Sequence, residues 1–255
     1  MEETLEDIIY HYVCITSGII CVLFAFFLLD IRPYKKRIKQ LCPVLLPKRY
    51  INARISLGIA YIVLGLLTSL QVLLSMPNET NTFLPLPGLV IASSQALLFT
   101  MAILSFYNSP FANHKMIWGN MIPLILLFIL HEVCSESQMV QREIRIMWLV
   151  VYGIQLFEFT LTFFHARHIY ERALIKNLGN SLICERYMQK ELIPLFIGTL
   201  FIGVYALLSF FFTEKWSLSV FIIIYTIYYA AVGVYTLRYA EKSHSIMDIS
   251  EVIEE

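Results

Sequence analysis

The chain has 255 residues, of which 58% are hydrophobic and 15% are charged, and its mean hydropathy is +0.68. Soluble domains are about half apolar and about a quarter charged, so this composition indicates an integral membrane protein. The formal net charge is zero, which argues against a basic surface for nucleic acid, and we expect no direct nucleic-acid binding by this segment.

Seven stretches are long and apolar enough to cross the hydrocarbon core, which takes about 20 residues of helix. In chain order they are 9–29, 55–75, 87–107, 117–134, 146–166, 193–213 and 217–237. No stretch alternates as a barrel strand does, and backbone in lipid must form its hydrogen bonds internally. The sequence therefore predicts an all-α membrane protein. We expect a seven-transmembrane-helix bundle over 1–238 and an acidic tail or truncated linker over 239–255.

Lysine and arginine are distributed unevenly among the loops between these stretches. The first, third and fifth loops and the tail contain sixteen of them, whereas the second, fourth and sixth loops contain three. Because cytoplasmic loops carry the excess, we predict an inner-membrane protein with its N-terminus outside and its C-terminus in the cytoplasm. The first loop, 31–54, has eight basic residues. These residues either determine this topology, which is the simpler role, or bind anionic lipid headgroups. The candidates for headgroup binding are Lys35, Lys36, Arg37 and Lys39.

A carboxylate interrupts the fifth stretch. Glu158 lies in the segment YGIQLFEFTLTFFHARH, residues 152–168. An ionisable group inside the bilayer costs about 2.5 kcal/mol or more, which makes it a functional candidate. Gln155, Glu158 and Thr162 have the i, i+3, i+7 spacing of one helix face. Either Glu158 binds a cation, a proton or a polar ligand, or its protonated carboxyl ties two helices together through an amide such as that of Gln95.

The seventh stretch is rich in tyrosine instead. Tyr225, Tyr228, Tyr229 and Tyr235 lie broadly along one side of the expected helix. Such tyrosines usually pack in a core with their hydroxyls bonded, and the alternative is a pocket for a small amphipathic ligand. The candidate ligand-binding residues are therefore Glu158, Gln155, Thr162, Gln95, Tyr225 and Tyr228.

Motifs for catalysis or metal binding are missing from the sequence. The segment HEVCS, 131–135, has Ser135 where the zinc motif HExxH requires a second histidine. His165 and His168 flank Arg167 at a helix end, where solvated histidines are commoner than metal ligands. The seventh stretch contains no lysine that could hold retinal. We predict neither an enzyme nor a cofactor or metal site.

Three segments carry a resemblance to a known family. They are ARISLGIAYIVLGLL (53–67), ASSQALLFTMAILSFYNSPF (92–111) and ARHIYERALIKNLGNSLICERYMQKELIP (166–194). They resemble the N-terminal membrane region of AraC-type transcription regulators of Bacteroides-like bacteria, and the matching residues are Gln95, Asn108, Pro110 and Tyr170. The sequence departs from that family at 177–180, which reads NLGN instead of an Asn-aromatic pair with acidic residues, and in ending before a DNA-binding domain.

The resemblance implies a seven-helix bundle, N-terminus outside, that precedes a cytoplasmic helix-turn-helix domain. The implied function is a membrane sensor or anchor that passes a signal to a cytoplasmic output domain or partner, with transcription as the output. Two alternatives stay open: a small-molecule or ion transporter that uses Glu158, and a non-catalytic subunit of a membrane complex. The expected partners are the lipid bilayer, a small-molecule ligand, the DNA-binding output domain or partner, and a second copy in a homodimer.

Overall fold

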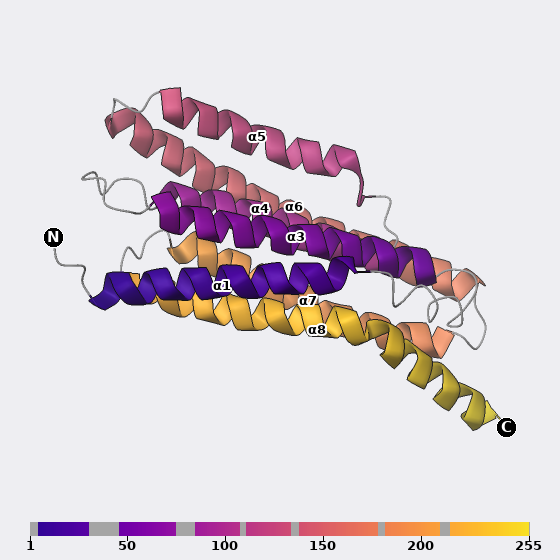
Figure 1. Cartoon of the computed structure of the whole chain (residues 1–255). Helices are drawn as coiled ribbons and strands as arrows, with labels where there is room; N and C mark the ends of the chain where they lie inside the picture. The colour runs from indigo at the N-terminus through magenta and orange to yellow at the C-terminus, as the bar shows by residue number, and fades with distance from the viewer. Residues whose placement is uncertain are drawn as a thin grey trace.

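The computed structural model describes residues 5–30, 46–74, 85–107, 111–133, 138–177, 182–209 and 215–254. Within these ranges every regular element is an α-helix, which confirms the all-α prediction for the described residues. The helices are α1 (Leu5–Leu29), α3 (Leu46–Leu74), α4 (Pro85–Phe106), α5 (His114–Val133), α6 (Gln138–Asn177), α7 (Leu182–Ser209) and α8 (Lys215–Glu254). They run side by side, and the two termini lie at opposite ends of the bundle (Figure 1).

The helices have the length and composition of membrane spans. In the described residues, four are long and apolar enough to cross a bilayer: Leu5–Leu29, Tyr50–Ser69, Arg142–Arg172 and Trp216–Tyr239. Three further apolar stretches are shorter, namely Ile91–Phe106, Lys115–His131 and Leu192–Leu208. Large apolar side chains on the outside of these helices suit contact with lipid, because hydrocarbon is as apolar as the side chains themselves.

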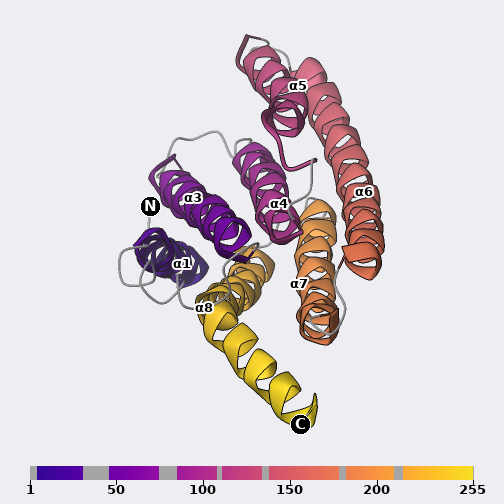
Figure 2. The ribbon, with the colours of Figure 1, turned by 90° about the vertical axis from the view of Figure 1, so that its right-hand side faces the viewer.

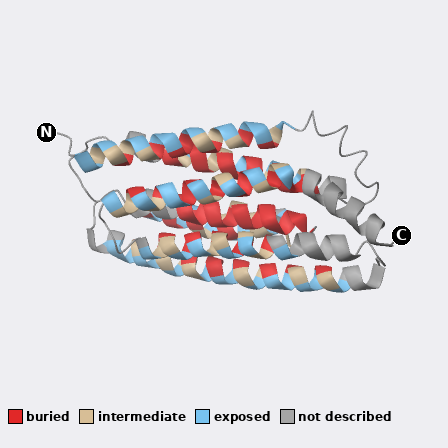
Figure 3. Ribbon diagram, turned by 90° about the horizontal axis from the view of Figure 1, so that it is seen from below, coloured by how far each residue is buried: buried red, intermediate tan, exposed pale blue. Residues whose placement is uncertain are grey.

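The central helix of the bundle is α4. It packs against α3, α5, α6 and α7, while α8 packs against α1 and α7. Figure 2 shows this order in cross-section, with α1 at one side and the α5–α6 pair at the other. From Ile91 to Phe106 every residue of α4 is buried except Leu98. The buried residues of the described helices gather along the inner faces of the bundle (Figure 3), so α4 provides the core around which the other helices pack.

Two glycines bring α1 and α3 into close contact. A Cβ added to Gly65 would lie 3.0 Å from the carbonyl oxygen of Gly18, and one added to Gly18 would lie 2.7 Å from the Ser69 hydroxyl. Helices in membranes associate through van der Waals packing, which small residues strengthen by letting the backbones approach. The pair therefore fixes the spacing of the first two described helices.

Two helices, α6 and α8, extend furthest beyond their predicted apolar stretches. The fifth predicted span was 146–166, but α6 runs over 40 residues from Gln138 to Asn177. Likewise α8 continues to Glu254, so the segment predicted as a tail or linker from 239 is helical up to that residue. The added turns are rich in Glu, Lys and Arg. These residues have high helix propensity but are too polar for the hydrocarbon core. The headgroup candidates Lys35, Lys36, Arg37 and Lys39 lie outside the described residues.

Arg54 corrects one detail of the loop assignment. The sequence placed it at the end of the first loop, but α3 begins at Leu46 and Arg54 lies within it, fully buried. Its Nε donates to the Leu28 carbonyl oxygen at 3.0 Å, and its Nη2 donates to those of Phe27 at 2.7 Å and Asp30 at 3.2 Å. The last turn of α1 has no basic residue of its own. Arg54 thus supplies both the donors and the positive charge that a helix C-terminus requires.

Candidate functional site

Polar side chains from five helices lie buried or half-buried within the bundle, and we call this set the central polar cluster. Its members are Ser17 of α1, Tyr61 and Thr68 of α3, Gln95 of α4, Thr199 of α7, and Tyr225, Thr226, Tyr228 and Tyr229 of α8. All of them are buried except Tyr228, which is half-buried. Because the surroundings are apolar, each hydroxyl or amide needs a partner inside the protein.

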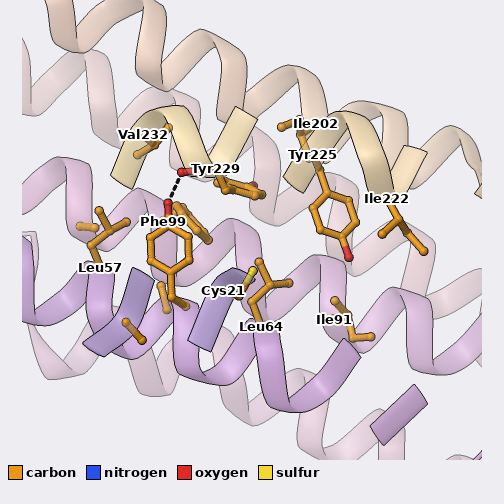
Figure 4. Packing of buried hydrophobic residues seen from close by; sticks show 14 of the residues in the cluster. Cys21, Leu57, Leu64, Ile91, Phe99, Ile202, Ile222, Tyr225, Tyr229 and Val232 are labelled. Carbon is orange, nitrogen blue, oxygen red and sulfur yellow. Dashed lines mark hydrogen bonds between the residues drawn. The ribbon is translucent and has the colours of Figure 1, made fainter. Parts of the chain in front are cut away.

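On one side of the cluster, α8 is bonded to α1 and α3. The Ser17 and Thr226 hydroxyl oxygens are 2.7 Å apart, and Thr226 also donates to the Ile222 carbonyl oxygen of its own helix at 2.6 Å. The Tyr225 hydroxyl lies in hydrogen-bonding range of the Ser17 and Thr68 side chains. Figure 4 shows the Tyr225 ring pointing away from α8 toward the side of the bundle that carries Leu64. These contacts give α8 a specific register against two helices.

Tyr229 connects α8 to α3 and α4. Its backbone carbonyl accepts a hydrogen bond from the Tyr61 hydroxyl, and its ring stacks on Phe99 with 3.8 Å between the ring centroids. Its hydroxyl lies in hydrogen-bonding range of the Gln95 side chain. The Gln95 Nε2 has no hydrogen-bond partner among the described residues, although the side chain is only 7% exposed. This amide is therefore a donor available to a ligand or to an ordered water.

Tyr228 connects α8 to α7. Its hydroxyl lies 3.1 Å from the Thr199 hydroxyl and also donates to the Leu195 carbonyl oxygen. The ring occupies space beside Gly198 that any side chain at that position would fill. Through Tyr225, Tyr228 and Tyr229, α8 contacts polar groups on each of the four helices around it.

A second set of polar contacts holds α6 against α4, α5 and α7. The Gln155 Nε2 donates to the Asn120 carbonyl oxygen at 2.8 Å, and the Trp148 Nε1 donates to the Ser93 hydroxyl at 3.3 Å. The Tyr152 hydroxyl donates to the Gly203 carbonyl oxygen at 3.1 Å. Pro123 has no N–H to donate, which deprives the carbonyl of Gly119, the residue before Asn120, of its donor within the helix. The Gln155 amide thus bonds a stretch of α5 whose own hydrogen bonding is incomplete.

Glu158 does not join either set. Gln155 is 4% exposed and Thr162 is half-buried, but Glu158 is exposed on the outer face of α6. Among the described residues, no hydrogen bond or ion pair involves its carboxyl. A step of three residues turns the side chain by about 60° from Gln155, which is enough to leave the narrow buried stripe of a peripheral helix. The structure therefore separates the three residues and gives Glu158 no contact with Gln95.

A further polar group lies beside α6, directly after the end of α4 at Phe106. The Tyr107 hydroxyl is buried and has no hydrogen-bond partner among the described residues, and its ring packs edge-on against Phe163 and Tyr170. Arg167 donates to Glu171 at 2.9 Å. The Tyr107 hydroxyl is thus a polar group in the core that can donate one hydrogen bond and accept another.

The structure brings together three of the predicted ligand residues, Gln95, Tyr225 and Tyr228. Sequence reasoning did not include Ser17, Tyr61, Thr68, Thr199 and Thr226 among the candidates, and it noted Tyr229 without including it. The three threonines also bond their own helices, at Leu64, Leu195 and Ile222. Such bonds are common for Thr in apolar helices, so only the helix arrangement distinguishes these hydroxyls. Among the described residues, no group of three His, Cys, Asp or Glu side chains lies close enough to hold a metal.

Replacing Gln155 by leucine will loosen α5 without unfolding the bundle. The change removes a hydrogen bond worth about 1 kcal/mol from a helix whose main packing partners among the described helices are α4 and α6. We expect faster hydrogen exchange in α5 and unchanged exchange in α1 and α3. Thr160→Val is the matched control, because the Thr160 hydroxyl bonds only its own helix, at Leu156. Equal exchange in the two variants would contradict the assigned role.

Apolar helices of spanning length, glycine contacts and buried hydroxyl clusters together define a multi-pass helical membrane protein. No protein-family model, curated protein or solved structure matches the chain.

Proposed function

We propose that this protein is a seven-helix integral membrane sensor or anchor module that passes a signal to a cytoplasmic output domain or partner. The N-terminus lies outside and the C-terminus in the cytoplasm of an inner membrane, as the sixteen-to-three distribution of Lys and Arg indicates. The observation that carries the proposal is the placement of α8. It is hydrogen-bonded to α1, α3 and α7, its Tyr229 ring stacks on Phe99 of α4, and it continues without a break to Glu254. A transcriptional output rests on the resemblance of three segments to AraC-type regulators.

The central polar cluster supplies the part of the protein that a signal would change. A ligand that accepts a hydrogen bond from Gln95, or that competes for the hydroxyls of Tyr225 and Tyr228, would bond to one arrangement of α8 better than to another. That difference in affinity is the minimum requirement for a switch. A polar network in a low-dielectric core is sensitive to such competition, because each group that loses its partner bears the full cost of desolvation.

Aromatic side chains also pack around α8 where it leaves the bundle. The Tyr239 ring lies between Tyr50 and Phe106, with 6.0 Å and 4.9 Å between the ring centroids. The Tyr50 hydroxyl donates to the Leu237 carbonyl oxygen at 3.4 Å. A shift or rotation of α8 that begins at the central polar cluster must therefore repack these rings before it reaches the helical extension. Because such rings pack in discrete arrangements, α8 is expected to switch between two positions and not to move gradually.

Distance measurements on the membrane-embedded protein test this proposal. We would place spin labels at His168 on α6 and at Lys242 on α8 and compare Gln95→Leu and Tyr225→Phe with the wild type in nanodiscs. We expect both variants to change the distance distribution between the labels. Ile227→Ala is the control, because Ile227 is 66% exposed at the middle of the apolar stretch Trp216–Tyr239 of α8. If the core variants and the control leave the same distribution as the wild type, α8 does not respond to the cluster and the proposal fails.

One observation also favours a second function, that of a non-catalytic subunit of a membrane complex. Glu158 lies on the outside of the bundle, where it can contact another protein. Stoichiometric co-purification with a different membrane protein would support that function. The transporter alternative used Glu158 inside the bundle, and no contact of the described residues favours it.

A further inference from the structure

The outer face of α6 presents a carboxyl in the middle of an apolar surface. Glu158 is exposed, and Ile154, Phe157 and Leu161 around it are 61%, 66% and 55% exposed. The midpoint of the apolar span Arg142–Arg172 is residue 157, so the carboxyl lies at about the centre of the membrane. Lipid tails offer no hydrogen bond at that depth. The placement of Glu158 therefore requires a partner outside this copy of the chain.

The apolar residues beside Glu158 follow the spacing of a coiled-coil seam. Glu158 itself lies on such a repeat: the steps are four, three, four, three and four along Met147, Val151, Ile154, Glu158, Leu161 and His165, all of which are exposed except the half-buried Val151. Side chains at such a repeat pack knobs into holes against a second helix with the same repeat. Glu158 lies near the centre of this seam, where two crossing helices come closest, so it faces the same residue of a parallel second copy.

We propose that the outer face of α6 is the interface of a homodimer, in which the Glu158 carboxyls of two copies bond to each other. An isologous contact about a two-fold axis places the same residue on both sides of the interface. With the axis along the membrane normal, both carboxyls lie at the same depth. Each protonated carboxyl donates one O–H and accepts one hydrogen bond, so the two groups satisfy each other without a charge in hydrocarbon.

The charges elsewhere on the surface favour this symmetric arrangement over a head-to-tail one. The other exposed charged residues that the structure describes lie at or just beyond the ends of the apolar stretches: Glu6, Asp30, Lys115, Arg142, Glu143, Arg172, Lys190 and Arg238. A head-to-tail contact would therefore leave Glu158 facing an apolar surface. The inference rests on the placement of Glu158 and is independent of the proposed sensor function.

Cysteine cross-linking in native membranes tests the interface directly. We would introduce Ile154→Cys or Leu161→Cys into the otherwise unchanged chain, oxidise the membranes, and look for a product of twice 29.6 kDa. The wild type gives the baseline for the natural cysteines. Ile227→Cys is the matched control, because Ile227 is similarly exposed, at 66%, in the middle of the apolar stretch Trp216–Tyr239 of α8. We expect cross-linking at both α6 positions and none above baseline at Ile227.

Substitution of Glu158 itself tests the carboxyl pair. Interhelical hydrogen bonds of this kind change affinity by roughly 3-fold to 20-fold, and we expect Glu158→Leu to weaken the dimer by about that factor. Glu158→Gln keeps a donor and an acceptor and should stay within about 2-fold of the wild type. The readout is energy transfer between labelled copies as the lipid-to-protein ratio rises. Both variants should fold normally because the side chain is exposed.

Three results would overturn the proposal. The first is a wild-type affinity for Glu158→Leu, which would mean that the carboxyls do not pair. The second is cross-linking at Ile227 that equals that at Leu161, which would mean random collision. The third is an α6 cross-link to a product of a different mass, which would identify a different membrane protein as the occupant of this face.

Discussion

Replacing Arg54 by alanine will destabilise the bundle by about 3 kcal/mol or more. The guanidinium donates to the carbonyl oxygens of Phe27, Leu28 and Asp30 from a fully buried position. Alanine would leave these acceptors without that donor, and an unsatisfied buried group costs about 1–3 kcal/mol. The change also removes a cation from the negative end of the α1 dipole. Reversible unfolding in mixed micelles, followed by tryptophan fluorescence or circular dichroism, measures the loss.

Two further variants separate the buried contacts from the charge. Arg238→Ala removes an exposed arginine near the end of the apolar part of α8 and should change stability by less than about 0.5 kcal/mol. Arg54→Lys keeps the charge but lacks the planar fork that reaches several acceptors at once, so we expect an intermediate loss. If Arg54→Ala were as stable as Arg238→Ala, the carbonyl oxygens at the end of α1 would not depend on Arg54.

The role of Arg54 shows what hydropathy leaves out. The sequence predicted the positions of the apolar stretches because transfer into lipid depends on composition alone. A hydropathy boundary at 55 assigned Arg54 to a loop, whereas α3 begins at Leu46. Helix formation depends on backbone hydrogen bonds and continues through polar turns. One signal could have indicated the contact: the last turn of α1 contains no basic residue, so its carbonyl groups required a donor from elsewhere.

The direction in which Glu158 points was beyond the reach of periodicity. In a soluble protein, the apolar stripe of a helix marks its inner face. In a membrane protein the outside is apolar as well, so the spacing of Gln155, Glu158 and Thr162 predicts a shared side without saying which side faces the core. Packing decides instead: α6 buries Trp148, Tyr152 and Phe159 against its neighbours, and Glu158 consequently faces away from the bundle.

The central polar cluster was predictable in part for a similar reason. Gln95 stood out because an amide in an apolar run is rare and needs a partner. Serine and threonine gave no such signal, because they can bond their own helix, as Thr68 does at Leu64. The partners of α8 come from helices far apart in the sequence: Ser17 and Thr226 are separated by 209 residues. Only the helix arrangement brings those groups together.

Replacing Gly65 by leucine will separate α1 from α3 and destabilise the bundle by about 2 kcal/mol. Even a Cβ at this position would lie 3.0 Å from the Gly18 carbonyl oxygen and 3.0 Å from Val22. The first of these contacts is with backbone, so it cannot be relieved by a change of rotamer, and overpacking of this kind costs about 1–3 kcal/mol. We expect unfolding at lower denaturant concentration. The loss of the close approach should also speed hydrogen exchange in α1.

Gly119→Leu is the matched control for that experiment. A Cβ at Gly119 would have no atom within 4 Å, and the residue is exposed in α5. The same substitution there should be neutral or slightly stabilising, because leucine favours helix over glycine by up to about 1 kcal/mol. The two variants thus differ only in whether the new side chain meets a neighbouring backbone. Equal stability of the Gly65 and Gly119 variants would mean that α1 and α3 are not held at glycine contact distance, and the close packing of this pair would have to be abandoned.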